Sequence, residues 1–350
     1  WTLVTNALLN AAWVLTEIFI VSWVTSKNPI LSIFHRNQHR HQHRQPQMLV
    51  RLFNCLALLC LSAVTQAQTI TLTSPYGPGH FTTPPIYPIL EAANQSQTKY
   101  NFVLELKPGG NGTVNVRYMD QSPDLRLSII APAHVENIDS GELQENNYVP
   151  VSGLGDACVG VFVRNDSVFK KPELIVGGVG FGNAAHLTGL SIADKFNQTS
   201  RYIPFKTNLD AFVNLGQEGG IDITTERVLT FNNMKTKLQS VKVYAVNCPV
   251  RLPESSDTPT LAELGYRVPT VWNIFIANKA MSLDRRTELA KILDTAIVKV
   301  GAAKIKELSD LRPPVFDNVG IQQFYNSRIE THRSVLKKYK SKVEADKTYK

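Results

Sequence analysis

Short apolar runs alternate with amphipathic stretches along the chain from about residue 69 onward. Runs rich in β-branched residues predict strands, and apolar positions that recur every three or four residues predict helices. The predicted strands cover residues 69–74, 101–106, 125–130, 158–164, 174–177, 201–204, 221–225, 241–247 and 271–277. The predicted helices begin near Phe81, Thr113, Asn183, Asn208, Glu226 and Leu283, and a charged helix runs from about Ile321 to the end. This alternation is typical of parallel sheets with crossover helices, so the predicted fold class is α/β.

Two apolar runs precede the first predicted strand. Met48 opens a short basic segment, residues 52–64 form an apolar core, and Thr65-Gln66-Ala67 offers the small residues that signal peptidase requires. We therefore expect residues 48–67 to be a signal peptide that is cleaved after Ala67 and exports the protein. A buried helix is the alternative, but the run is short and a strand-like segment follows it at once.

Residues 1–47 allow two interpretations. The apolar run at 1–24 is long enough for a membrane anchor, and a histidine-rich tract of low complexity follows it at 35–43. The segment is otherwise an upstream or non-native extension that the mature protein does not carry. The complete signal that begins at Met48 favours the extension.

Length and composition predict a globular protein with two lobes or domains. The chain has 350 residues, of which 43% are hydrophobic, and this is enough to bury a large core. The formal net charge of +8 would permit an acidic partner, but the basic residues are spread along most of the chain. Because no basic motif with interleaved aromatic residues occurs, we do not expect nucleic acid as a partner. No cofactor is expected either.

Glycine clusters follow three of the predicted strands, at residues 77–79, 109–112 and 177–182. At the carboxyl end of a parallel strand, glycine lets the backbone approach a ligand, and the next helix offers free N–H groups at its N-terminus. These clusters predict an anion site. The alternative for any single cluster is that its glycines only turn the chain.

Cys158 and Cys248 are the cysteines that remain after cleavage of the signal peptide. In an oxidising compartment they could form one disulfide bond if the fold brings them together. Each also lies in or beside a strand-like run, so two separate buried thiols explain them equally well.

Four segments resemble the periplasmic receptors of tripartite tricarboxylate transporters. They read KPGGNGTVNVRYM at 107–119, GGVGFGNAAHLTG at 177–189, YIPFK at 202–206 and DTPTLAELGY at 257–266. The resemblance covers about residues 69–317. It implies a type II binding protein with two lobes, each a mostly parallel sheet flanked by helices. Lobe 1 would comprise residues 68–164 and 271–350, and lobe 2 residues 165–270.

The same resemblance implies a function and a set of site residues. A small carboxylate, such as a di- or tricarboxylate, would lie between the lobes and be captured by hinge closure, and the monomeric receptor would pass it to membrane permease subunits. Backbone N–H groups would hold the carboxylate, with Lys206 as counter-charge unless it is only a surface lysine. His186 would orient its loop by a hydrogen bond to a carbonyl, or contact the ligand directly, and Asp222 would select an amino-bearing ligand. The implied site residues are Tyr76, Gly77, Gly79, His80, Phe81, Thr82, Gly178, Gly180, Phe181, Gly182, Asn183, His186, Phe205, Lys206, Thr207, Asn208 and Asp222.

The first loop departs from the family pattern. Family members carry two glycines and then an aspartate there, whereas this chain has Gly79 followed by His80, Phe81 and Thr82. The larger rings would narrow the site or stack on a flat ligand.

Other classes of function are disfavoured by the motifs. An enzyme could use Cys158, His186 or Asp222, but the chain has no nucleophile elbow, HExxH, Walker loop or Cys-x-x-Cys. The GGVGFG run is only loosely similar to a dinucleotide fingerprint, because Asn183 stands where the third glycine is required. A sensor that binds ligand and reports to a signalling partner remains an alternative that the residues do not separate from a transport receptor.

Overall fold

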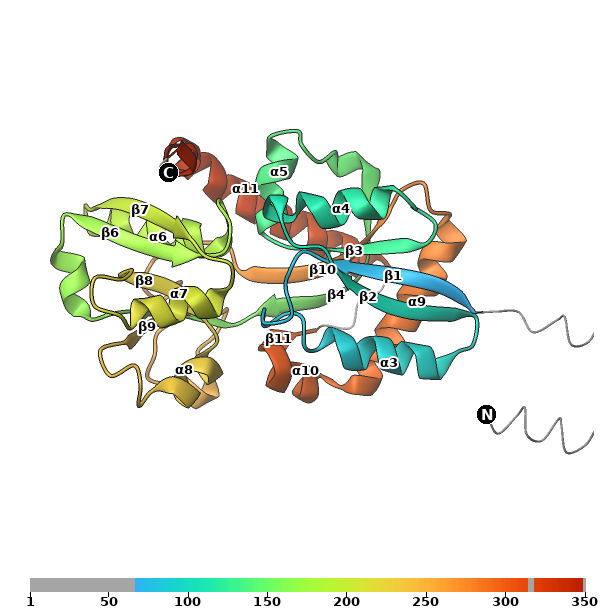
Figure 1. Ribbon diagram of the computed structural model, residues 1–350, viewed down its shortest axis with the longest axis horizontal. Coiled ribbons are helices and arrows are strands. Elements are labelled where there is room, and N and C mark those ends of the chain that lie inside the picture. The colour runs from blue at the N-terminus through green and yellow to red at the C-terminus, as the bar shows by residue number, and fades with distance from the viewer. Residues whose placement is uncertain (1–66, 314–317, 349–350) are drawn as a thin grey trace, which may run out of the picture. The chain divides into compact units, whose positions relative to one another are not determined.

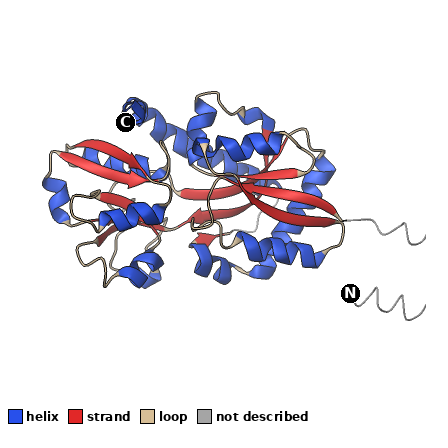
Figure 2. Ribbon diagram, viewed as in Figure 1, coloured by secondary structure: helices blue, strands red, loops and turns tan. Residues whose placement is uncertain are grey.

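The computed structural model describes residues 67–313 and 318–348. Residues 1–66 lie outside the described part, and with them the segment at 1–47 and all of the predicted signal peptide except Ala67. Within the described part, every helix is too short or too polar to cross a membrane. The elements belong to two sheets with helices packed against them (Figures 1 and 2).

The first sheet has six strands in the order β11-β4-β10-β3-β1-β2. Strand β1 pairs in parallel with both β2 and β3, whereas β10 runs antiparallel to β3 and β4. The parallel strands therefore end at one edge of the sheet. The strands are β1 (Gln68–Ser74), β2 (Tyr100–Leu106), β3 (Arg126–Ile130), β4 (Tyr148–Ala157), β10 (Val271–Asn278) and β11 (Leu311–Arg312).

Helices cover both faces of this sheet. Strand β10 shows why, since Trp272, Ile274 and Ile276 point into one core, and Phe275 points into the other. Helices α3 and α9 close the core around Phe275, and α4 and α5 close the core around Trp272. Because successive side chains of a strand point to opposite faces, the nearly continuous apolar run of this central strand requires burial of both faces. The helices are α3 (Ile86–Ser96), α4 (Thr113–Asp120), α5 (Ala133–Asp139), α9 (Leu283–Val300) and α10 (Ala302–Ser309).

The second sheet has five strands in the order β7-β6-β8-β5-β9. Strand β6 is parallel to β7 and β8, and β5 is antiparallel to β8 and β9. Strand β5 is buried throughout, with Phe162 in one core and Val161 in the other. The strands are β5 (Val159–Val163), β6 (Glu173–Gly178), β7 (Thr199–Pro204), β8 (Ile223–Glu226) and β9 (Lys242–Asn247), and the helices are α6 (Ala184–Lys195), α7 (Asn208–Leu215) and α8 (Val228–Met234).

The chain first passes between the sheets at a single residue. Strand β4 ends at Ala157 in the first sheet and β5 begins at Val159 in the second, with Cys158 between them. The expected boundary after Arg164 is therefore too late by the length of β5, because the apolar run that holds both strand ends gives no sign of the crossing. Cys158 forms a disulfide bond with Cys248, and their Cα atoms lie 5.0 Å apart. Of the two alternatives for these cysteines, the disulfide is the one present.

The C-terminal helix α11 (Asn318–Thr348) makes a further connection between the sheets (Figure 1). Its first half packs into the core of the first sheet through Ile321 and Tyr325. Its second half packs through Leu336 and Val343 against α6 of the second sheet. Assigning all of residues 271–350 to lobe 1 is thus wrong for the second half of this helix, whose apolar stripe faces the other lobe.

Candidate functional site

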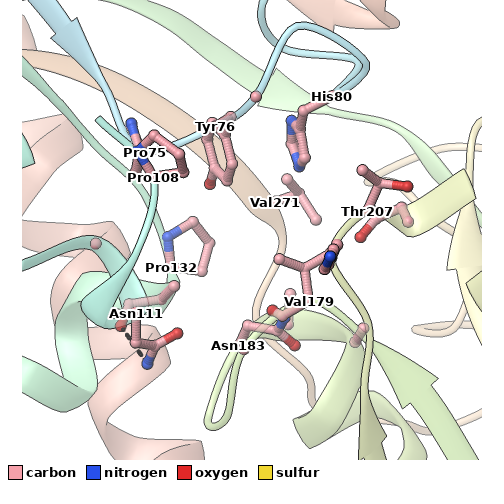
Figure 3. A pocket seen from close by; sticks show the side chains of 18 of the residues that line it. Pro75, Tyr76, His80, Pro108, Asn111, Pro132, Val179, Asn183, Thr207 and Val271 are labelled. Carbon is pink, nitrogen blue, oxygen red and sulfur yellow. Dashed lines mark hydrogen bonds between the residues drawn. The ribbon is translucent and has the colours of Figure 1, made fainter. Parts of the chain in front are cut away.

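A cavity of about 500 Å³ lies where the parallel strands of both sheets end (Figure 3). Strands β1, β2 and β3 of the first sheet and β6 and β7 of the second all lead into it, as is usual for ligand sites in α/β proteins. The volume is in the range of small-molecule sites. The cavity is lined by Pro75, Tyr76, Gly77, His80, Phe81, Pro108, Gly109, Asn111, Gly112, Pro132, Ala133, His134, Val179, Gly180, Asn183, Ala184, Ala185, Lys206, Thr207, Asn208, Thr225 and Val271.

One side of the cavity is built on the N-terminus of α6. Asn183 is its N-cap, and the side-chain oxygen of Asn183 accepts a hydrogen bond of 2.9 Å from the N–H of His186. Ala184 and Ala185, the first two helical residues, line the cavity. Their N–H groups have no partner within a helix, and the first turn contains no acidic residue. The positive end of the helix dipole therefore faces the cavity.

Lys206 and the start of α7 complete this side, which we call the α6 wall (Val179, Gly180, Asn183–Ala185 and Lys206–Asn208). Among the described residues that line the cavity, Lys206 is the only lysine or arginine, and none is an aspartate or glutamate. Helix α7 differs from α6, because Asp210 closes a capping box with Thr207 through two bonds of 3.1 Å. A carboxylate thus already occupies the α7 terminus, whereas the α6 terminus is free for an anion.

The opposite side carries stacked rings. The Tyr76 and His80 rings lie 3.7 Å apart at 8°, and the His80 and Phe81 rings 4.6 Å apart at 23°. Prolines that follow the strand ends fill the rest of this side, which we call the aromatic wall (Pro75–Gly77, His80, Phe81, Pro108 and Pro132). Figure 3 shows Tyr76 and His80 across the cavity from Val179 and Asn183.

The titratable groups of the aromatic wall are neutral near pH 7. Burial lowers the pKa of His80 to about 3 and raises the pKa of the Tyr76 hydroxyl. In both groups desolvation disfavours the charged form. The aromatic wall can therefore donate hydrogen bonds but contributes no charge.

His134 lies at the base of the cavity and is held by its neighbours. Its Nδ1 accepts from the Ala131 N–H at 3.0 Å, and its Nε2 lies 3.3 Å from Oδ1 of Asn115. Burial lowers its pKa to about 4. Gly112, at φ 96°, leaves the space that the ring occupies, since a Cβ there would lie 2.6 Å from Nε2. Both ring nitrogens are engaged, so this residue shapes the cavity.

Asn111 joins the two lobes at one end of the cavity. Its side-chain N–H₂ donates to the carbonyl of Ala133 at 3.2 Å in the first lobe and to that of Phe181 at 3.0 Å in the second. Gly180, at φ 74°, has no room for a side chain because Asn111 lies against it. The described lobes are thus in contact across the cavity.

Several of the predicted site residues line the cavity, and others support those that do. The lining includes Tyr76, Gly77, His80, Phe81, Gly180, Asn183, Lys206, Thr207 and Asn208. Outside the lining lie Gly79, Thr82, Gly178, Phe181, Gly182, His186, Phe205 and Asp222.

His186 stands behind the α6 wall. Its Nδ1 accepts from the Gly182 N–H at 3.1 Å, and its Nε2 donates to Asp346 of α11 at 2.9 Å. Burial lowers the pKa of His186, and the bond to Asp346 opposes that shift. The ring holds the loop that leads into α6 by accepting from a backbone N–H and donating to a carboxylate, whereas the expected bond was to a carbonyl.

Asp222 does not fit the role expected for it. Its carboxylate is fully buried, lies 2.5 Å from Nζ of Lys171 and accepts from the Ile175 N–H at 3.0 Å. These partners lie within the second lobe and away from the cavity lining. A carboxylate satisfied in this way cannot select an amino group on a ligand.

The sequence reasoning missed two loops of the cavity. One is residues 108–112 after β2, which was noted as a glycine cluster but not assigned to the site. The other is residues 132–134 after β3, which carries no glycine. The signal that could have found both is position, because each follows a strand parallel to β1.

The residues considered for catalysis are occupied elsewhere. Cys158 is in the disulfide, and neither His186 nor Asp222 lines the cavity. In the described ranges, no three His, Cys, Asp or Glu residues are grouped so as to hold a metal ion. The histidine tract at 35–43 lies outside these ranges.

Comparisons with known proteins find likeness in structure. No family model and no curated protein matches the chain. The periplasmic binding protein BugD is similar at a TM-score of 0.63 and 18% identity, over 78% of this chain and 97% of that one. MatC from Rhodopseudomonas palustris with bound malate is similar at 0.63 and 19% identity, over 77% and 99%.

Two further solved structures are similar to this chain. An R. palustris protein with adipate has a TM-score of 0.64 at 18% identity, over 78% of this chain and 97% of that one. A TctC solute-binding protein from Polaromonas has 0.58 at 17% identity, over 79% and 100%. The chain therefore has the two-lobed α/β fold of the Bug and TctC periplasmic solute-binding proteins.

Proposed function

We propose that this protein is an exported periplasmic receptor that captures a small organic carboxylate and delivers it to the membrane permease subunits of a tripartite tricarboxylate transporter. The observation that carries the proposal is the α6 wall. It presents a helix N-terminus free of acidic residues, together with Lys206, to a cavity whose described lining includes no carboxylate.

The physical case rests on charge. The N-terminus of a helix carries roughly half a positive charge and several unpaired N–H donors. A carboxylate bound to Ala184 and Ala185 would accept from these donors, and Lys206 would balance its charge. Closure of the two lobes over the ligand would exclude water and make these interactions stronger than they are at an exposed surface.

The structural neighbours support the same ligand class. One holds malate and another holds adipate, and both share this fold at TM-scores of 0.63 and 0.64. The predicted signal peptide at 48–67 and the Cys158–Cys248 disulfide fit an oxidising compartment outside the cytoplasm.

Capture would occur by closure of the two lobes. The carboxylate would bind first to one wall, and closure would bring the other wall over it and form the contact between Asn111 and Phe181. The segments that join the lobes at Cys158, between β9 and β10, and along α11 would form the hinge. The closed form would then dock on the permease.

Thermal unfolding of the purified protein with a panel of mono-, di- and tricarboxylates tests the ligand class. A ligand at a hundred times its Kd stabilises the folded state by about 2.7 kcal/mol, which shifts Tm by several degrees. We expect such a shift with at least one carboxylate and none with the corresponding neutral amides. No shift with any carboxylate would contradict the proposal, and turnover of a bound compound would indicate an enzyme instead.

Substitution of the cavity lysine tests the site. Lys206→Met should weaken carboxylate binding about tenfold in calorimetry, because it removes the one cationic side chain of the described lining. The matched control is Lys237→Met, which removes an exposed lysine outside the lining. Equal affinity in both variants would show that Lys206 is a surface lysine that does not contribute to carboxylate binding.

A further inference from the structure

His80 is held in one orientation by three neighbours. Its ring stacks on Tyr76 and on Phe81, and its Nδ1 lies 2.9 Å from the Thr82 hydroxyl. The ring is only 7% exposed. A histidine fixed in this way leaves one edge of its ring available to a ligand.

The hydrogen bonds of His80 also determine its tautomer. The Thr82 backbone N–H donates to Nδ1 at 3.3 Å, so Nδ1 is an acceptor. In a neutral imidazole the proton then resides on Nε2. Among the described residues, none bonds to Nε2, although His80 lines the cavity.

The Tyr76 hydroxyl is placed in a similar way. The Tyr76 ring lies nearly parallel to that of His80, and Figure 3 shows its hydroxyl directed toward the cavity. No described residue accepts from or donates to this hydroxyl. The two parallel rings thus bring two neutral donors to the same wall, opposite Asn183 of the α6 wall.

We infer that His80, with Tyr76 beside it, is a specificity-determining donor that binds an uncharged oxygen acceptor at the far end of the ligand. This inference rests on the proposed function, since it takes the α6 wall as the carboxylate site. The ligand class is then a monocarboxylate with a hydroxyl or carbonyl oxygen at the opposite end. A second ionised carboxylate would lose its hydration at a wall that offers neutral donors but no cation, which is unfavourable.

The test is calorimetry with matched ligands of one chain length: adipate, 6-hydroxyhexanoate and hexanoate, and the corresponding sets built on glutarate and succinate. In the best-fitting set, the hydroxy acid should bind about three- to tenfold more tightly than the unsubstituted acid, the increment expected for one hydrogen bond. It should also bind more tightly than the dicarboxylate.

Variants connect this preference to the residues. His80→Phe keeps a stacking ring but removes the donor, and it should abolish the preference for the hydroxy acid over hexanoate. His80→Gln restores an N–H and should recover part of the preference. Tyr76→Phe deletes a single oxygen. It provides a second test of the preference for the hydroxy acid if His80→Phe folds poorly. Tyr87→Phe is the control, because Tyr87 is 53% exposed on α3 and outside this cavity.

The outcomes separate this inference from the proposed function. If the compounds bind but His80→Phe and Tyr76→Phe leave the ratio of hydroxy acid to alkyl acid unchanged, the role of His80 is wrong and the receptor function stands. A dicarboxylate that binds more tightly than the hydroxy acid in every set would also contradict the inference about His80. If none of these compounds binds but another carboxylate of the thermal-unfolding panel does, the inference falls and the receptor function stands. If no carboxylate binds at all, both fall.

Discussion

The two walls of the cavity come from sheets of similar plan but differ in chemistry. In the α6 wall, the loops after β6 and β7 lead into helices and present a helix N-terminus and Lys206. In the aromatic wall, the loops after β1, β2 and β3 present rings and prolines whose titratable groups are neutral. Positive charge is thus concentrated on one side of the site.

This asymmetry gives a ligand a direction. An anionic group is stabilised where the donors and the lysine converge, and the body of the ligand packs against apolar rings. The strength of binding would then depend chiefly on the α6 wall, and the choice among carboxylates on the aromatic wall. Each of the following predictions tests one side of this division.

The largest effect is expected from charge added to the α6 wall. Asn183→Asp keeps the oxygen that caps α6 but places a carboxylate beside the bound anion. At about 6 Å and an effective dielectric constant of about 20, this repulsion amounts to about 2.8 kcal/mol, or roughly a hundredfold in Kd. Calorimetry against 6-hydroxyhexanoate measures this loss of affinity. Asn214→Asp, which keeps the acceptor for the Ile221 N–H outside the cavity, is the control. Unchanged affinity in Asn183→Asp would place the anion elsewhere.

A smaller effect is expected from low pH on the stability of the folded protein, through the contact of α11 with the loop before α6. His332 is buried, donates through Nε2 to the carbonyl of Gly182 at 2.7 Å, and burial lowers its pKa to about 4. The unfolded chain, with a histidine pKa near 6.5, binds the proton first, so stability is lost as pH falls from 6.5 toward 4.

For His332 this loss is about 1 kcal/mol between pH 6.5 and 5.5. Urea unfolding at the two pH values should show a smaller decrease for His332→Gln than for the natural protein. The same decrease in both proteins would show that His332 is not held neutral.

The smallest effect is expected from pH on the two histidines that line the cavity, His80 in the aromatic wall and His134 at the base. Because burial keeps the pKa of His80 at about 3 and that of His134 at about 4, neither ring gains charge between pH 8 and 6. The affinity for a carboxylate should therefore change less than twofold over this range. Much tighter binding at pH 6, abolished by His80→Phe, would show that His80 is a cation in the complex.

Much of the fold could be predicted from the sequence, because the strand and helix patterns are local. Helices that begin at Thr113, Asn208 and Leu283 were predicted at these residues. Strand β4 was not predicted, because Pro150, Gly153 and Gly155 interrupt its apolar pattern. Its pairing with β10 also has two irregularities of register. Strands built on tertiary pairing have weak local signals.

The site was predictable only where a motif marks it. The loops around His80, Gly180 and Lys206 were found by resemblance, whereas Pro132 and Ala133 line the cavity through a short helix with no motif. Asp222 was misassigned because its partner Lys171 is 51 residues away, and their contact depends on the folded sheet. The pairing of Cys158 with Cys248 likewise required the fold.

The most direct test of the division between the walls is a crystal structure of the protein with 6-hydroxyhexanoate, whose two ends differ in shape. We predict that the carboxylate lies within hydrogen-bonding distance of the Ala184 and Ala185 N–H groups, near Lys206, with the hydroxyl at Nε2 of His80. A ligand bound in the reverse direction, with its carboxylate against Tyr76 and His80, would contradict the account.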